Sequence, residues 1–408
     1  MKAILVGVKY SHMTYDFEKS LEELKSLAYS CDMEVLDIVT QKLDVISPQY
    51  YIGKGKVDEI KNRIDSHDIV IFNEELSPLQ VKNLTDELGV EVSDRSDLIL
   101  RIFESRAQTK EAKLQVEIAR NQYLLPRLAG MKKELYSQQG GSGFRGRGEK
   151  QIELDRRIIQ KHLVQAKREL QYIVKQRQTQ RRKRQRLDQK VVCLVGYTNS
   201  GKSSLLNYFT QKKVFQQDML FASLQTASRH VMLKGHKSVI MSDTVGFINQ
   251  LPHHLIQAFR STLEEVKEAD VLVHVIDASS PDCLQHIQTT LEVLQELGVK
   301  DTPMIYVYNK IDQERYAFLQ PCQPYVYTSV KDQIGLDALE DLLIETLFKD
   351  DQFIELFIPY DQSEVLGILK QNYEFIKEDY KDEGIFIQLY IEQKDLHKYQ
   401  KYIYEPIS

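Results

Sequence analysis

The chain has 408 residues, of which 42% are hydrophobic and 28% charged, a balance typical of folded proteins with several domains. No apolar stretch approaches the ~18 residues of a membrane span and no charged-then-apolar leader is evident, so we expect a cytoplasmic protein. Cys31, Cys193, Cys283 and Cys322 are scattered, which disfavours zinc and disulfides. Residues 101–190 carry 24 Lys and Arg against 9 Asp and Glu within a chain of net charge −5, which indicates a polyanionic partner for that segment.

Residues 1–104 alternate short apolar runs with helix-like stretches. The expected strands are Ala3–Val8, Glu34–Val39, Ile69–Phe72 and Val90–Val92, with helices near 18–31, 54–66 and 77–89. This alternation predicts an N-terminal α/β subdomain with a parallel sheet. Gly53-Lys54-Gly55-Lys56 lacks the spacing of a phosphate loop, so we interpret it as a turn that opens a helix.

From residue 105 to 188 the pattern changes to that of two long helices. Apolar positions recur at seam spacing on both sides of a glycine-rich stretch, at Ala107, Leu114, Ile118 and Leu125 and then at Ile152, Ile159, Leu163, Ala166, Leu170 and Ile173. Such spacing predicts helices that bury a narrow stripe against each other. Five glycines within residues 140–149 predict the non-helical tip of an antiparallel hairpin. Pro126 is expected to kink or interrupt the first arm.

This hairpin is basic at the tip and at the end of its second arm. Five of residues 181–186 are Lys or Arg, and Phe144, Arg145 and Arg147 stand among the tip glycines. A basic run is often only a solvated helix face. In an otherwise acidic chain it favours RNA, whose phosphates cations neutralise and whose unpaired bases stack on aromatic and arginine side chains.

Residues 189–351 have the pattern of a doubly wound α/β domain. Strands are expected at 191–195, 238–242, 271–276 and 304–308, and helices near 202–210, 253–268, 283–297 and 335–348. Residues 352–408 have the pattern of a small C-terminal α+β domain without a catalytic set, with strands expected at Phe353–Ile358 and Ile385–Ile391 and a helix from about residue 361. The predicted fold class is therefore α/β, with a helical hairpin between the two α/β domains.

The first chemical motif is Gly196-Tyr197-Thr198-Asn199-Ser200-Gly201-Lys202-Ser203, which fits GxxxxGKS directly after an apolar strand. Its glycines let the loop wrap so that backbone N–H groups face phosphates at a helix N-terminus. Lys202 can reach the β- and γ-phosphates, and the Ser203 hydroxyl can bind Mg²⁺. We predict a P-loop nucleotide site here.

Two later motifs complete a guanine-nucleotide site. Asp243-Thr244-Val245-Gly246 fits DxxG: Asp243 can hold Mg²⁺ through water, and the Gly246 N–H can sense a γ-phosphate. Asn309-Lys310-Ile311-Asp312 fits NKxD, and the Asp312 carboxylate can accept from guanine N1–H and N2–H₂, a donor pair that adenine lacks. Thr328-Ser329-Val330 follows another strand, where a backbone N–H can meet guanine O6. The sequence therefore predicts a Ras-like GTPase domain that binds GTP and GDP.

Phe247 follows the DxxG motif, where Ras-like GTPases have a glutamine that orients the attacking water. Phenylalanine has no donor or acceptor, so we expect slow intrinsic hydrolysis and completion of the site by a partner or a cation. Asn199 is a candidate ligand for K⁺, with simple capping of the loop as the equal alternative. Phe247 itself can instead pack on the sheet.

At this point the sequence resembles the HflX family of ribosome-associated GTPases over nearly its whole length. The resemblance rests on GYTNSGKSSLLN, DTVGFI and NKID, and more specifically on NEELSPLQVKNL, VSDRSDLILRIFESRAQTKEAKLQVEIARNQYLLPRL and GGSGFRGRGEKQIELDRR. It implies a GTP-dependent factor that binds the large ribosomal subunit and its rRNA. The hairpin tip would approach the peptidyl transferase centre, and the family's implied activities are subunit splitting and rescue of stalled ribosomes.

Two segments depart from the family pattern. The family's switch I usually reads FATLDPTTR, whereas this chain has Phe221-Ala222-Ser223-Leu224-Gln225 at its start. Ser223 then stands where a Mg²⁺-binding threonine is expected, and Gln225 replaces an aspartate. The tip carries larger residues than the family's usual small residues and proline, which raises the hypothesis of an altered task such as displacing a bound antibiotic.

The leading hypothesis is a monomeric cytoplasmic GTP hydrolase, with Mg²⁺ and a candidate K⁺ as cofactors, that splits or rescues stalled ribosomes. Lys202, Asn199 and Gly246 are the catalytic candidates, and Ser203 and Ser223 the metal ligands. Three alternatives stay open: a ribosome-assembly GTPase, a GTP-gated protein that silences ribosomes, and an RNA-dependent ATPase, which Asp312 disfavours.

Overall fold

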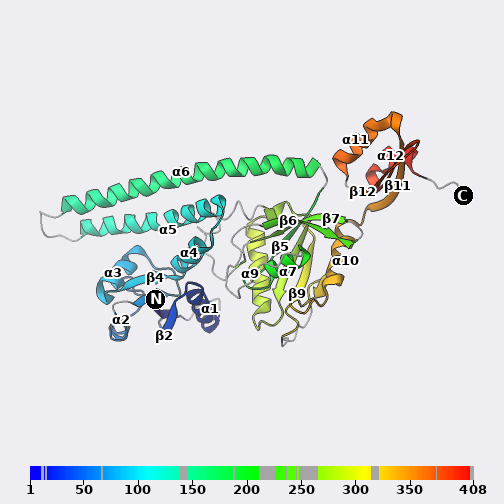
Figure 1. The fold of residues 1–408 in the computed structure, drawn as a ribbon. Helices are drawn as coiled ribbons and strands as arrows, with labels where there is room; N and C mark the ends of the chain where they lie inside the picture. Colours follow the sequence, from blue (N-terminus) through cyan, green and yellow to red (C-terminus); the bar gives the residue numbers. More distant parts are fainter. Residues whose placement is uncertain are drawn as a thin grey trace. The chain divides into compact units, whose positions relative to one another are not determined.

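The structure is a computed structural model of the chain. It describes residues 1–10, 13, 16–65, 68–137, 145–186, 189–210, 227–234, 237–244, 246–247, 265–313, 321–373 and 375–404. By its internal contacts the chain divides into two compact units (Figure 1). The first is built mainly on Met1–Ile173, and the second mainly on the chain from Val174 onward. The first unit contains one described sheet and the second contains two.

The first unit contains a four-stranded parallel sheet in the order β2-β1-β3-β4. Its strands are β1 (Lys2–Lys9), β2 (Glu34–Lys42), β3 (Asp68–Phe72) and β4 (Glu91–Asp94). Its helices are α1 (Phe17–Ser30), α2 (Lys54–Lys61), α3 (Pro78–Leu88) and α4 (Arg95–Arg106). Every residue of β3 is buried, as expected for a strand covered on both faces. The sequence predicted these strands and the first three helices, and α2 begins directly after Gly53.

The structure contains a separate helix, α4, that the sequence analysis did not predict. The first arm of the hairpin was expected to include Ala107, but α4 ends at Arg106 and Ala107 is an extended cap with φ −69° and ψ 107°. The arm proper is α5 (Lys110–Ser137), which runs through Pro126, so the proline does not interrupt it. Asp94 caps α4 by accepting from the Asp97 amide, which explains why a separate helix begins there.

The second arm is α6 (Arg145–Arg186). Lys110 at the start of α5 pairs with Glu169 at 3.0 Å, as an antiparallel arrangement requires (Figure 1). On α6, Ala166 is buried and Ile159, Leu163, Leu170 and Ile173 are half-buried among exposed neighbours, which matches the predicted seam. The tip prediction is wrong in part, because Arg145–Glu149 belong to α6; glycine costs little in a first turn whose N–H groups lack helical partners anyway. The rest of the tip lies outside the described residues.

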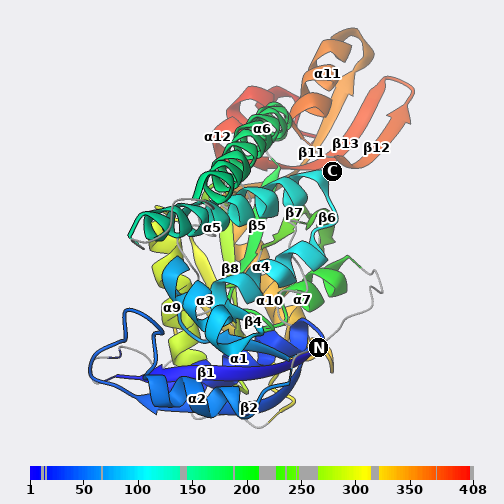
Figure 2. The same ribbon diagram turned by 90° about the vertical axis from the view of Figure 1, so that its left-hand side faces the viewer.

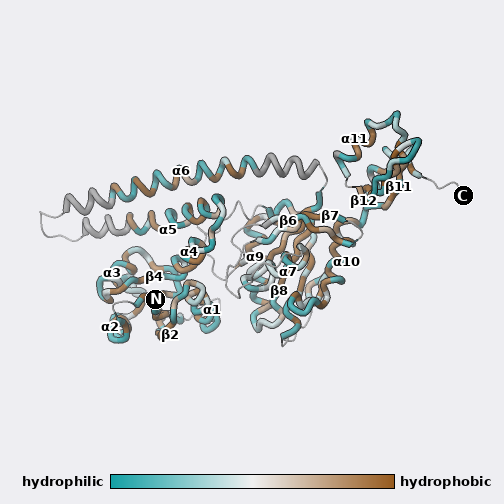
Figure 3. Tube along the Cα trace, viewed as in Figure 1, coloured by the Kyte–Doolittle hydropathy of each residue, from teal (hydrophilic) through white to brown (hydrophobic). Residues whose placement is uncertain are grey.

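The second unit contains a six-stranded sheet in the order β10-β9-β8-β5-β7-β6, in which only β6 is antiparallel to its neighbour. The strands are β5 (Lys190–Val195), β6 (Ala227–Leu233), β7 (Lys237–Asp243), β8 (Val271–Asp277), β9 (Met304–Asn309) and β10 (Tyr325–Tyr327). The described helices are α7 (Lys202–Phe209), α9 (Cys283–Glu296) and α10 (Leu336–Leu347). Hydrophobic residues concentrate on the strands (Figure 3). The sequence missed β6, and most of the helix expected at 253–268 lies outside the described residues.

The same unit ends in a three-stranded antiparallel sheet in the order β11-β13-β12 (Figure 2). Its strands are β11 (Asp351–Pro359), β12 (Phe375–Lys381) and β13 (Gly384–Glu392). Two short turns, η2 (Tyr360–Gln362) and η3 (Gln400–Tyr402), accompany the helices α11 (Ser363–Asn372) and α12 (Gln393–Tyr399). The sequence predicted β11, α11 and β13 of this α+β unit and missed β12 and α12.

Candidate functional site

The phosphate-binding loop joins β5 to α7, and two of its glycines are required by geometry. Gly196 has φ +144°, and a Cβ there would lie 2.2 Å from the carbonyl oxygen of Val275. Gly201 has φ +100°, and its Cβ would lie 2.2 Å from Nδ2 of Asn309. Asn199 is exposed and left-handed, with φ +60°, and its side chain makes no hydrogen bond to the described residues. The loop is therefore shaped by its own sequence into a tight cradle at the start of α7.

Lys202 occupies the interior of this cradle. Its side chain is buried, and Nζ donates to the carbonyl oxygens of Gly196 (3.1 Å) and Tyr197 (2.7 Å). Burial lowers the pKa of Lys202 to about 8, while the Asp243 charge opposes that shift. Its ammonium is thus poorly solvated, and the two carbonyl oxygens compensate its positive charge only in part. A polyphosphate could supply the missing negative charge.

A hydroxyl and a carboxylate meet beside the lysine. Ser203 Oγ donates to Oδ2 of Asp243 at 2.7 Å, and Asp243 is buried at the end of β7. Thr244 donates from Oγ1 to the Leu194 carbonyl at 2.7 Å, which ties the DxxG segment to β5. Such an oxygen pair suits Mg²⁺, a hard cation. Phe247 is buried, whereas Val245 and Phe221–Gln225, with Ser223 among them, lie outside the described residues.

The NKxD motif, predicted to read the base, is joined to the predicted phosphate loop by one side chain. Asn309 Nδ2 donates to the Ser200 carbonyl at 2.9 Å, and its Oδ1 accepts from Thr328 Oγ1 and from the Val330 amide, both at 3.3 Å. Asn309 is buried at the end of β9. The structure thus brings the predicted loop at Thr328–Val330 to the predicted NKxD motif and links both to the phosphate loop.

The carboxylate expected to read the base is also positioned by its neighbours. Asp312 Oδ1 accepts from Ser329 Oγ at 2.7 Å, and the Asp332 amide donates to the same hydroxyl oxygen at 3.1 Å. Lys310 has φ +64° and pairs with Asp277 at 2.8 Å. Because the serine holds one carboxylate oxygen, the orientation of Asp312 is fixed before any ligand arrives.

Three residues of this site could not be found from sequence motifs. His286 on α9 stacks on Tyr197 with ring centroids 3.8 Å apart. Asp277, at the end of β8, pairs with Lys310. His274 is buried on β8, and burial lowers its pKa to about 3, with the Lys202 charge acting in the same direction. The only sequence signal for these residues was their place on or just after a predicted strand or helix.

Other kinds of site find no support in the described part of the chain. Those residues contain no cluster of three or more His, Cys, Asp or Glu side chains that could hold a metal. All four cysteines are free thiols. Within the same ranges, no helix has the length and apolar character needed to cross a membrane.

Comparison with known families gives three matches along the chain. Residues 18–104 match the family described as GTP-binding GTPase N-terminal, and residues 106–184 match the GTP-binding GTPase middle region. Residues 191–310 match the family described as 50S ribosome-binding GTPase. The residues of the candidate nucleotide site lie within the match at 191–310 or just beyond it.

Curated relatives match over almost the whole length. A protein of Caldanaerobacter subterraneus called GTPase HflX is 43% identical over 95% of this chain and 90% of its own. Proteins of the same name from Alkalihalophilus pseudofirmus and Lacrimispora saccharolytica are 42% and 39% identical over 90% and 96% of this chain, and over 88% and 93% of their own. The similarity therefore extends to the N-terminal sheet, the hairpin and the C-terminal sheet.

Proposed function

The chain belongs to the HflX family and is a GTPase, and from that premise we propose that it acts on the large ribosomal subunit to split or rescue stalled ribosomes. The observation that carries the nucleotide part is the Asn309 side chain, which hydrogen-bonds to Ser200 of the phosphate loop and to Val330 of the base-side loop. This side chain fixes the distance between the two loops, so a guanosine polyphosphate could place its phosphates at the first loop and its base at the second.

Within this proposal each site residue has a role that follows from its position. The amides of Gly196–Ser203 and the ammonium of Lys202 would hold the phosphates. Asp312 would accept from the guanine N1–H and N2–H₂, with Thr328–Val330 beside the base, and the Gly246 amide would report the γ-phosphate. Bound GTP would order the switch segment Phe221–Gln225, and hydrolysis would release it.

Side-chain oxygen atoms at the site support the proposal that metal ions bind there. Ser203 and Asp243 already lie within hydrogen-bond distance of each other, which supports a Mg²⁺ site at this point, with Ser223 as a further ligand. Mg²⁺ would neutralise charge that develops on the phosphates. The exposed amide of Asn199 is the candidate K⁺ ligand, and exchange of K⁺ for Na⁺ in a GTP-turnover assay should then slow hydrolysis; equal rates would contradict that assignment.

The ribosomal partner is proposed from the hairpin. The segment is rich in Lys and Arg, and Arg157, Lys161, Arg168 and Lys175 are exposed on α6. Such cations can neutralise rRNA phosphates, with a strong dependence on salt. The match to 50S ribosome-binding GTPases supports the same partner.

The decisive test is light scattering of assembled ribosomes mixed with the protein and GTP. A fall in scattering, lost when Lys202 is replaced by Ala, supports splitting. Unchanged scattering with tight binding to immature large subunits would favour an assembly factor. If a non-hydrolysable GTP analogue supports repeated rounds of action as well as GTP, hydrolysis is dispensable and a silencing role replaces the proposal.

A further inference from the structure

The first unit contains a cleft whose lining shares no residue with the nucleotide site. It occupies about 530 Å³ between the loop that leads into α3 and the middle of α5, and its lining comprises Glu75, Leu76, Ser77, Pro78, Gln122, Tyr123, Pro126 and Arg127. That volume lies within the range of small-ligand sites. The residues of α5 fall at i and i+4, so they share neighbouring faces of one helix.

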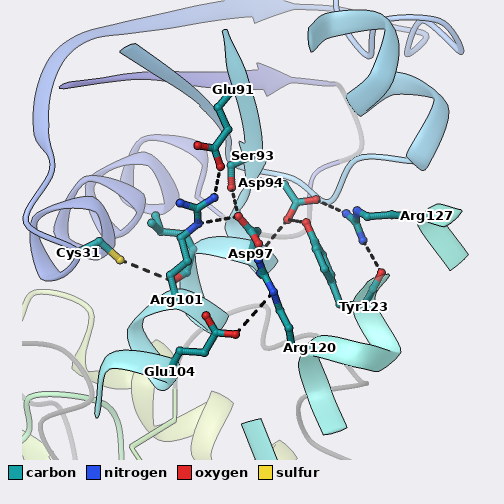
Figure 4. Close-up of polar contacts among 11 residues, drawn as sticks. Cys31, Glu91, Ser93, Asp94, Asp97, Arg101, Glu104, Arg120, Tyr123 and Arg127 are labelled. Carbon is teal, nitrogen blue, oxygen red and sulfur yellow. Dashed lines mark hydrogen bonds and ion pairs between the residues drawn. The ribbon is translucent and has the colours of Figure 1, made fainter. Parts of the chain in front are cut away.

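Arg127, the cationic side chain of the cleft, already has hydrogen-bond partners within the protein. Arg127 donates to Asp94 Oδ2 (2.6 Å), to the Leu76 carbonyl (3.1 Å) and to its own helix at Tyr123 O (3.2 Å), and its guanidinium lies 3.3 Å from the centre of the Tyr123 ring. Figure 4 shows Tyr123 and Arg127 both directed at Asp94, which is fully buried. The Asp94 carboxylate balances the charge of Arg127, so this arginine does not provide an anion site.

Gln122 and Glu75 supply the cleft with hydrogen-bond acceptors, alongside the donors of the Gln122 amide and the Ser77 hydroxyl. Oε1 of Gln122 is buried and has no hydrogen-bond partner among the described residues. Pro126 has no N–H, so the backbone carbonyl of Gln122 lacks the donor that the fourth following residue normally supplies. Glu75 is exposed at the rim and makes no ion pair within the described ranges. A buried acceptor without a donor costs free energy that a ligand's donor would recover.

From this combination we infer that the cleft binds the guanidinium group of an organic cation. A guanidinium offers five donors in a plane, which suits two acceptors on one helical turn and a carboxylate at the rim. Its weakly hydrated faces pack well on apolar walls, here Leu76, Pro78 and Pro126. An ammonium is a strongly hydrated point charge that gains less from such walls. This site does not depend on the proposed ribosomal role.

The test uses the full-length protein without ribosomes and follows binding by saturation-transfer NMR and calorimetry. Agmatine is the free guanidinium probe, butane-1,4-diamine the ammonium counterpart, and a capped arginine peptide represents a side chain of a partner protein. We expect saturable binding of a guanidinium probe, at least fivefold tighter than that of the diamine. Binding of agmatine points to a free small molecule, and binding of the peptide alone points to a protein partner.

Substitutions then locate the site. Glu75→Gln and Gln122→Leu should each weaken binding at least fivefold, while Glu22→Gln, the same charge change at an exposed position of α1, should leave it within twofold. Glu75 lies at the surface, so its variant keeps the test valid if Gln122→Leu folds poorly. The inference would be overturned if neither guanidinium probe shows saturable binding, or if the diamine binds as tightly as the guanidinium probe. Equal affinity of the probe for the Glu75→Gln and Glu22→Gln variants would also overturn it.

Discussion

The buried ammonium of Lys202 makes the stability of the nucleotide-free protein depend on pH. Burial lowers the pKa of Lys202 from 10.5 to about 8 in the folded state, so the unfolded chain holds this proton more tightly than the fold does. The protonated lysine therefore destabilises the fold at neutral pH, and the penalty is relieved as pH rises from about 8 towards 10.5. Linkage with these two pKa values gives a gain of about 1.3 kcal/mol between pH 7 and pH 9.

Urea unfolding of nucleotide-free wild type and Lys202→Met at pH 7 and pH 9 isolates this contribution, because other titrating groups are common to both proteins. The free energy of unfolding of wild type should rise by about 1.3 kcal/mol relative to the variant over that range. Lys300→Met, at an exposed lysine, should follow wild type. A difference between wild type and Lys202→Met that is the same at both pH values would refute the reasoning.

Three further substitutions test the nucleotide site and the buried ion pair between Asp94 and Arg127 of α5. Gly201→Ala places a Cβ against Asn309 and should reduce GDP affinity more than tenfold in a fluorescence titration; Gly298→Ala, also at positive φ but with open space around its Cβ, should not. Asp312→Asn should lower affinity for GTP about a hundredfold, since it turns one acceptor into a donor facing guanine donors; unchanged GTP affinity in competition with a labelled analogue would remove Asp312 from base recognition. Asp94→Asn replaces the buried carboxylate partner of Arg127 by a neutral amide and should lower the free energy of unfolding by about 3–5 kcal/mol. A decrease below 1 kcal/mol in urea unfolding would show that the ion pair contributes little to stability.

The parts that the sequence predicted are those with local signals. The interior of β1, Ala3–Val8, is a continuous apolar run, and β8 is apolar except for His274 and Asp277. The phosphate loop combines glycines at forced backbone angles with a lysine and a serine at fixed spacing. The three nucleotide motifs each follow a strand of one parallel sheet, so their convergence at one edge was expected from topology. In the structure, Asn309 provides the physical link between two of them.

The parts that it missed depend on tertiary contacts. The apolar pattern of α4 continues into that of α5, so the two helices look like one in the sequence. The extended Ala107 ends α4 at Arg106, and α5 begins only at Lys110. Strand β6 contains Arg229 and His230 and lacks an apolar run, so its pairing with β7 was not apparent. The partners of Asp94 come from α5, about 30 residues away, and no motif connects them.

The central claim is that a guanosine-triphosphate cradle is coupled to recognition of the large subunit. The most direct measurement is GTP turnover by the purified protein with and without large ribosomal subunits, at several salt concentrations. We predict at least tenfold stimulation by large subunits, absent with small subunits and lost as salt rises. Turnover that large subunits leave unchanged, at a salt concentration where they bind the protein, would contradict the account.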